Sequence, residues 1–163
     1  MTTTRRLEVI RQGAFAGAAG GLAEVAWVTL YAGMTGGDPA VLARGVTTAA
    51  GLSALLPASP VALGVTVHMA LAVALGVALA LAWSALRGAR PGLSNPYPLM
   101  LAALSGVWAT NFFIVLPIVS PAFVHIVPYA VSLASKLLFG VAAAAVLRWQ
   151  AASELRPVYR RSK

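Results

Sequence analysis

Four long apolar stretches follow one another along the chain, separated by short segments rich in Pro, Gly, Ser and Arg. The stretches cover residues 12–34, 59–86, 98–117 and 121–149. As α-helices that rise ~1.5 Å per residue, all four are long enough to cross a hydrocarbon core of ~30 Å. The hydrophobic pattern therefore predicts an all-α integral membrane protein built as a bundle of four transmembrane helices.

Helix-breaking residues set the expected ends of these stretches. Gly36 and Gly37 terminate the first helix, and Ser59 and Pro60 form an N-cap and first-turn pair for the second. In the fourth stretch Pro128 marks either a kink or the true start of the membrane-spanning part, because proline removes a helical hydrogen bond. Between the first two spans, residues 39–56 predict a short interfacial or re-entrant helix.

Composition supports one membrane domain over residues 1–163. Hydrophobic residues make up 60% of the chain and charged residues 10%, whereas soluble domains have ~45–50% apolar residues. The mean hydropathy is +0.83. There is no Cys, which excludes disulfides, thiolate metal sites and a Cys nucleophile.

The net charge of +8 is best explained by membrane topology. Lys and Arg residues lie before the first span, between the second and third spans, and in the tail at 150–163. Arg44, in contrast, lies in a loop on the other side of the membrane. By the positive-inside rule both termini are cytoplasmic, and we expect a multi-pass membrane protein. The basic residues form no aromatic-basic surface, so no nucleic-acid partner is expected. The length of the first span and its Glu24 favour a retained helix over a signal peptide.

Each apolar stretch carries one strongly polar residue near its middle: Glu24, His68, Asn111 and Lys136. Such residues are costly at membrane depth and usually face the bundle interior or an aqueous cavity. Counted from the outer helix ends at ~1.5 Å per residue, Glu24 lies ~15 Å deep and His68 ~12 Å. Lys136 reaches ~12 Å if its helix starts near Pro128, but ~22 Å if it starts at Pro121.

Small residues share the faces of several of these polar side chains. Closely spaced small residues allow transmembrane helices to approach, so these faces are expected to point into the bundle. The direction of Asn111 is less well defined, because bulky side chains surround it. The expected helix-packing residues are Gly13, Gly17, Gly20, Gly21, Gly64, Gly76 and Gly140.

The polar residues permit two interpretations. In one, Glu24 and Lys136 form a buried pair, aided by His68 and Asn111, that only fixes the helix register. In the other, the same residues form a protonatable site in the outer half of the bilayer that binds a proton, an ion, a quinone or a polar headgroup. Metal-ligand spacing, a phosphate loop and a nucleophile-base pattern are all missing from the sequence, so we expect neither an enzyme nor a metal or other cofactor.

The leading functional hypothesis is a small permease-like or proton-responsive membrane protein. One alternative is an accessory or anchor subunit, working in a homo-oligomer or a larger membrane complex with its Gly-rich faces as partner surfaces. A second is an electron-transfer subunit with haem or quinone, although His125 and His68 lie at different depths for a bis-His site. In every case the lipid bilayer is the expected environment.

Short motifs through most of the chain resemble the YagU-like family of poorly characterised bacterial inner-membrane proteins. They include Ala23-Glu24-Val25, a Gly64 to His68 approach followed by Gly76, and Leu116-Pro117 before Pro121. Lys136 stands where the family pattern has His. The resemblance implies the same membrane architecture and location and no particular activity.

Overall fold

The computed structural model describes residues 3–160, with side chains described through Ser153. All regular elements in this part of the chain are helical, and no strand occurs in it. In chain order they are α1 (Thr3–Thr35), α2 (Ala40–Ala49), α3 (Pro60–Ala89), α4 (Tyr97–Thr110), the π-helical turn η1 (Asn111–Val115), α5 (Leu116–Val119), the 3₁₀ helix η2 (Pro121–His125) and α6 (Tyr129–Arg160).

Four helical segments are long and apolar enough to cross a membrane, which confirms the predicted all-α bundle. They are α1, α3, the continuous run Tyr97–Val119 that joins α4, η1 and α5, and Tyr129–Ser153 of α6. The α2 helix has ten residues and does not span. The chain is therefore a multi-pass membrane protein.

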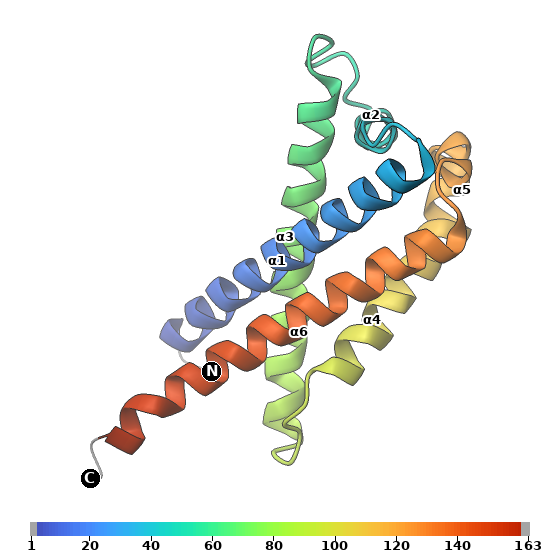
Figure 1. Ribbon diagram of the computed structural model, residues 1–163. Coiled ribbons are helices and arrows are strands. Elements are labelled where there is room, and N and C mark those ends of the chain that lie inside the picture. Colours follow the sequence, from blue (N-terminus) through green and yellow to red (C-terminus); the bar gives the residue numbers. More distant parts are fainter. Residues whose placement is uncertain (1–2, 161–163) are drawn as a thin grey trace.

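Helix α1 occupies the centre of the bundle. It packs against α3 and against α6, while α6 also packs against α4 and α2 lies against α3 (Figure 1). In Figure 1 α1 and α6 run beside each other in opposite directions, and α3 is steeply inclined to both. This arrangement places one face of α1 within reach of side chains from both α3 and α6.

Glycines allow α1 and α3 to touch backbone to backbone. A Cβ atom on Gly13 would lie 2.6 Å from Val77 Cα, and one on Gly76 would meet the backbone of Gly17 and Gly13. Side chains of any size would hold the helices apart, so this contact depends on the small residues.

The other expected packing glycines have different neighbours. Gly20 is covered by the Phe139 ring, 2.6 Å from a Cβ position, and Gly21 by Ala72 of α3. Gly64 adjoins the Ala43 carbonyl of α2, whereas Gly140 has only ordinary van der Waals contact, at 3.4 Å, with α4. The glycine faces thus adjoin four different helices.

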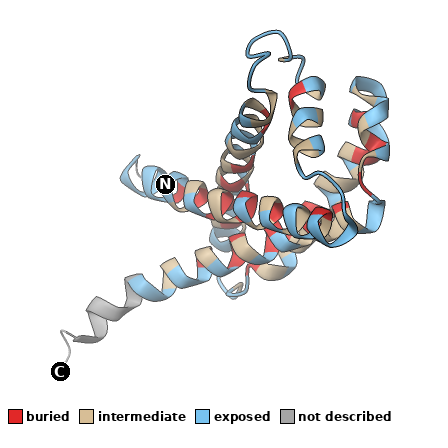
Figure 2. Ribbon diagram, turned by 45° about the horizontal axis from the view of Figure 1, so that its top comes forward, coloured by how far each residue is buried: buried red, intermediate tan, exposed pale blue. Residues whose placement is uncertain are grey.

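Buried residues concentrate where the helices face one another, and the outward surfaces are exposed (Figure 2). Met100, Leu104 and Phe139 form the centre of the main hydrophobic cluster. Large apolar side chains such as Ile118, 78% exposed, and Phe113, 60% exposed, point outward. In a membrane-spanning chain these exposed apolar groups are satisfied by lipid.

The fourth span begins at Tyr129, not at residue 121. Pro128 disfavours the helical conformation at the preceding Val127 and cannot donate to a continuing helix, so the chain forms the separate 3₁₀ helix η2 first. The α6 helix then continues through Arg160, so residues 150–160 of the expected tail are helical. Residues 161–163 of that tail lie outside the described part of the chain.

The third span contains a local widening around Pro117. The Leu116 N–H bonds to the Asn111 carbonyl, five residues back. A proline ring clashes with the carbonyl four residues before it, here that of Phe113, and the π-helical turn relieves this clash.

The first span also differs from its expected bounds, since α1 begins at Thr3.

The predicted helix within residues 39–56 forms only from Ala40 to Ala49. Thr47 is buried and its hydroxyl donates to the Pro60 carbonyl at 2.6 Å, which ties α2 to the start of α3. Gly45 lies inside α2 and packs against the Phe123 ring, which is 2.7 Å from a Cβ position on Gly45. The α2 helix thus covers one end of the bundle.

An exposed ion pair stabilises the start of α2. The Arg44 guanidinium donates to Asp38 at 2.6 Å, and the Ala40 N–H donates to the same carboxylate at 2.9 Å. The side-chain bond from Arg44, followed by the backbone bond, holds the pKa of Asp38 below its ordinary value of 3.8. Because the folded-state pKa is lowered, the stabilisation is present above that value and is lost as the pH falls through the folded-state pKa.

Asp38→Asn should therefore lower the thermal midpoint at neutral pH by a small amount, because the pair is exposed and surface pairs contribute little. The difference from wild type should shrink as the pH falls below 3.8. Thermal unfolding followed by circular dichroism at several pH values measures both. An equal difference at neutral and strongly acidic pH would contradict this role of the ionised carboxylate.

Candidate functional site: a buried charge cluster on three helices

Glu24 of α1 is almost completely buried, with 3% of its surface exposed. Its Oε1 atom lies 2.6 Å from Lys136 Nζ of α6 and accepts a hydrogen bond from the Ser135 hydroxyl at 3.3 Å. Its Oε2 atom lies 3.6 Å from His68 Nε2 of α3. Side chains from two helices therefore surround one carboxylate at the centre of the bundle.

Lys136 is less deeply buried than its partner. Its side chain is 20% exposed, against 4% for that of Glu24. The ammonium group also lies 6.0 Å from the centre of the Phe139 ring, within the range of a cation–π contact. Lys136 is thus held by a carboxylate and by an aromatic ring next to the packed face of Gly20.

His68 takes a looser position in the cluster. Its Nε2 atom is buried and has no hydrogen-bond partner within the described residues, since 3.6 Å to Glu24 is too long for a good hydrogen bond. The side chain as a whole is 25% exposed. His68 therefore faces Glu24 without the short contact that Lys136 makes.

The convergence follows from the helix packing. Gly17 and Gly21 let α3 approach α1 closely, and Gly20 makes room for Phe139 of α6. Glu24 lies one turn beyond these glycines on the same helix, so it faces both neighbours. Because α6 starts at Tyr129, Lys136 lies about two turns into its helix. This is the register in which Lys136 and His68 were expected to lie at the same depth in the membrane.

Two tryptophans fix α6 in this register. Trp27 Nε1 of α1 donates to the Val131 carbonyl at 3.0 Å. Trp108 Nε1 of α4 donates at 3.0 Å to the Ser132 hydroxyl, which in turn donates to the Tyr129 carbonyl. Since Val131 and Ser132 lie one turn before Ser135 and Lys136, these bonds position the segment that contacts Glu24.

The fourth polar residue of the sequence pattern does not join the cluster. Asn111 opens the π-helical turn η1 and is half-buried. It makes no hydrogen bond or ion pair to Glu24, His68 or Lys136 among the residues described. His125 lies apart as well, on η2, where its side chain is exposed.

Ser135 is the member of the cluster that sequence reasoning missed. The sequence pattern marked only Lys136 in this part of the chain, whereas a hydrogen bond to Glu24 also comes from Ser135 beside it. The signal in the sequence that could have identified Ser135 is its position as a small polar residue next to a Lys within a transmembrane span. The Phe139 ring over Lys136 was also missed, because it resembles an ordinary core residue.

Charge balance explains why the cluster tolerates burial. A carboxylate left alone in an apolar interior is strongly destabilised, and a partner that remains paired with it offsets much of that cost. Glu24 has a Lys at contact distance and a hydroxyl donor on the same oxygen. Chemically the arrangement can hold or exchange a proton, and it presents N–H donors of Lys136 and His68.

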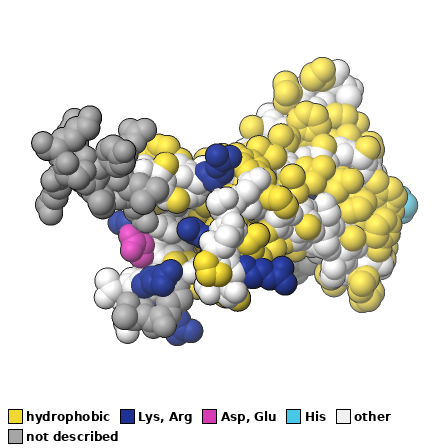
Figure 3. Space-filling model, turned by 90° about the horizontal axis from the view of Figure 1, so that it is seen from below, with side chains coloured by type: hydrophobic (Ala, Val, Ile, Leu, Met, Phe, Trp, Pro, Cys, Tyr) yellow, Lys and Arg dark blue, Asp and Glu magenta, His cyan; other side chains and the backbone are white. Residues whose placement is uncertain are grey.

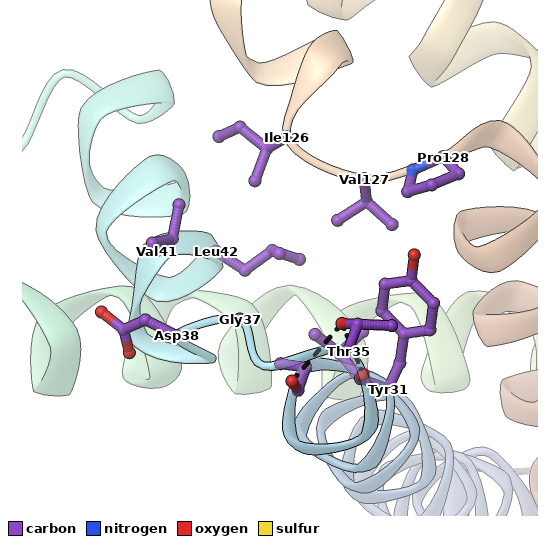
Figure 4. Close-up of a pocket in the computed structure, with 11 residues that line it drawn as sticks. Tyr31, Thr35, Gly37, Asp38, Val41, Leu42, Ile126, Val127 and Pro128 are labelled. Carbon is purple, nitrogen blue, oxygen red and sulfur yellow. Dashed lines mark hydrogen bonds between the residues drawn. The ribbon is translucent and has the colours of Figure 1, made fainter.

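One cavity lies about two turns beyond the cluster along α1, at the α2 end of the bundle. It measures about 280 Å³ and is lined by residues from α1, α2 and the segment before α6. Figure 4 shows the Tyr31 side chain directed toward Pro128, while the Asp38 carboxylate points away. Neither Glu24, His68 nor Lys136 lines this cavity.

Comparison with models of protein families, with curated proteins and with solved structures returned no match to this chain. The resemblance to the YagU-like family therefore stays a prediction. What is established from the molecule itself is a multi-pass helical bundle with a buried ion pair at its centre.

Proposed function

We propose that this chain is a non-enzymatic, permease-like or proton-responsive protein of the bacterial inner membrane, with both termini in the cytoplasm. The observation that carries the proposal is the buried Glu24 carboxylate held by Lys136 and faced by His68. Ionisable residues placed inside transmembrane helices commonly serve ion pathways and proton relays.

Protonation gives this cluster a way to act on the bundle. Glu24 connects α1 to α6 through Lys136 and Ser135, and it faces α3 through His68. Binding a proton to the carboxylate removes its attraction for the ammonium group and leaves Lys136 without its counter-ion. The packing of three helices is thereby linked to one protonation event.

Exposure limits which species the cluster would accept. The side chains of Lys136 and His68 are 20% and 25% exposed, whereas that of Glu24 is 4% exposed. An arriving species therefore meets the Lys136 and His68 side chains first, and Lys136 offsets the negative charge that would attract a cation. We therefore favour a proton, or an anion accompanied by a proton, over a cationic substrate.

The proposed orientation rests on the distribution of basic residues. On the face seen from below, Lys and Arg side chains gather toward one part, and hydrophobic side chains are most abundant over the other part (Figure 3). Arg87, at the end of α3, and Arg11, early in α1, belong to the basic segments. An excess of Lys and Arg marks the cytoplasmic side of membrane proteins.

No specific observation favours the accessory-subunit or electron-transfer alternatives. His68 faces Glu24, and His125 is exposed on a different element, so the two histidines do not form a pair of axial ligands among the described residues. The permease-like proposal is based on the Glu24 cluster, to which α1, α3 and α6 all contribute side chains. We therefore take it as the leading function.

Glu24→Gln should abolish proton flux in proteoliposomes, because Gln fills the same space but cannot exchange a proton at that position. Flux is measured with a pH-sensitive dye trapped inside the vesicles, at matched protein content and with the helical circular-dichroism signal as a folding check. Glu8→Gln, which changes a half-exposed surface carboxylate, is the control and should leave flux unchanged. Undiminished flux in Glu24→Gln would make the carboxylate purely structural.

A further inference from the structure

We infer that the groove between the first half of α1 and the last part of α6 is a binding site for one phospholipid with a primary-amine headgroup of the ethanolamine type. The groove measures about 770 Å³ and lies apart from the Glu24 cluster. The inference does not depend on the proposed transport function.

Polar residues line one end of this groove and apolar residues line the other end. This order matches the polar headgroup and the apolar acyl chains of a phospholipid. Glu8, Arg11 and Gln150 lie at one end, and Phe15 and Leu22 lie farther along α1. The polar end is adjacent to the α1 start, and the apolar end lies nearer the bundle centre. A headgroup at the first end would direct its acyl chains toward the second.

The length of the groove fits one leaflet. Leu22 lies 14 residues after Glu8 (22 − 8), which in a helix that rises ~1.5 Å per residue corresponds to ~21 Å. A bilayer including its headgroup regions is ~40–45 Å thick, so one leaflet measures about half of that. The groove therefore extends from the headgroup level to near the membrane midplane.

The polar end offers partners for both charges of a zwitterionic headgroup. Arg11, exposed over 72% of its side chain, is available to a phosphate, and the Glu8 carboxylate lies 4.0 Å from it. Guanidinium groups bind phosphate well, and a carboxylate attracts the ammonium. A headgroup with phosphate and amine in sequence can contact both.

A buried hydrogen-bond acceptor without a partner favours a headgroup with a primary amine over one with a trimethylammonium group. Gln150 lines this groove, and its Oε1 atom is buried and has no hydrogen-bond partner within the described part of the chain. A buried carbonyl oxygen without a donor is costly. A primary ammonium supplies N–H donors for Gln150, whereas a trimethylammonium headgroup has none and a glycerol headgroup lacks the positive charge for Glu8.

The apolar end is shaped for an acyl chain. Phe15 and Leu22 are 60% and 61% exposed, and the small residues Ala18 and Ala19 lie between them along the groove. Trp149, 70% exposed, flanks the polar end, where tryptophan commonly marks the membrane–water boundary. Small residues between two larger apolar side chains leave room for a flexible chain.

Native mass spectrometry of the delipidated full chain tests the inference. The protein is offered equal amounts of phosphatidylethanolamine, phosphatidylcholine and phosphatidylglycerol with identical acyl chains. We expect one retained lipid per chain, with the ethanolamine lipid preferred about tenfold, the ratio that one charge-assisted hydrogen bond of typical strength provides. Equal retention of ethanolamine and choline lipids would overturn the headgroup assignment.

Three variants locate the site, each checked for its helical circular-dichroism signal. Gln150→Leu should retain lipid but lose the preference for ethanolamine over choline, and Arg11→Ala should weaken retention of all three lipids. Arg87→Ala, which removes a basic residue that contacts Trp83 outside the groove, is the matched control and should change nothing. Unchanged selectivity in Gln150→Leu, unchanged retention in Arg11→Ala, or a dimer that forms by closing the groove and excludes lipid, would contradict the assignment.

Discussion

Lys136→Met is expected to destabilise the bundle by ~3–5 kcal/mol, the cost of leaving a buried charge without its partner. Glu24 would remain 3% exposed and would keep only the Ser135 hydroxyl and the more distant His68. Methionine matches the length of the lysine stem, so the loss reports the charge more than the packing. The free energy of unfolding in mixed detergent micelles measures it.

Glu24→Gln should be less destabilising than Lys136→Met. The ammonium that it leaves unpaired is 20% exposed and retains the Phe139 ring, whereas the carboxylate left by the lysine variant has almost no exposed surface. Ser135→Ala is the control variant. It should cause the smallest loss of stability, ~1 kcal/mol, since it removes one hydrogen bond. If the lysine variant were no less stable than Ser135→Ala, the charge of Lys136 would contribute nothing to the fold.

Gly76→Ala is the second substitution with a large expected effect. The new methyl group would meet the backbone of Gly17 and Gly13, which cannot move without separating α1 from α3. We expect destabilisation of ~1–3 kcal/mol or more, the usual range for overpacking, despite the better helix propensity of alanine. Thermal unfolding followed by circular dichroism measures the change.

Gly106→Ala provides the matched control for this packing prediction. Gly106 lies in the third span and has no atom within 4 Å of a Cβ position. Alanine there should be neutral or stabilise by up to ~1 kcal/mol through helix propensity. Equal behaviour of the two variants would mean that the α1–α3 backbone contact does not limit stability.

The transmembrane helices and the ion pair could be predicted from the sequence because both follow from local rules. Apolar length locates a span, and an acid and a base at one depth on small-residue faces are expected to pair. The prediction for Lys136 depended on Pro128, since the alternative start at residue 121 would have placed it deeper than His68. The observed start at Tyr129 gives the register in which the three residues meet.

Asn111 and Ser135 show where sequence reasoning fails. The sequence left the direction of Asn111 undefined, and in the structure Asn111 opens the π-helical turn before Pro117 and lies outside the cluster, which only the tertiary structure reveals. Ser135 joins the cluster because of the exact rotation of α6, which Trp27 and Trp108 fix through bonds to neighbouring residues. Contacts between distant segments of this kind have no local signature.

The proposed proton-responsive function would use the same Glu24 carboxylate that contributes to the stability of the bundle. If Glu24 exchanges a proton during function, the contact between α1 and α6 must loosen when it does, because Lys136 and Ser135 both bind that side chain. The Trp27 bond to Val131 lies one turn away and is a second link between the two helices. Under the proposed function, proton exchange and helix packing would therefore be coupled at this position.

The double-mutant cycle of Glu24→Gln and Lys136→Met tests the central claim most directly. Because the two groups lie 2.6 Å apart, removing both charges leaves neither unpaired, and the double variant should recover much of the stability that the single variants lose. We predict a coupling free energy of ~2 kcal/mol or more, within the range measured for residues in contact. Strictly additive losses would contradict a buried Glu24–Lys136 pair.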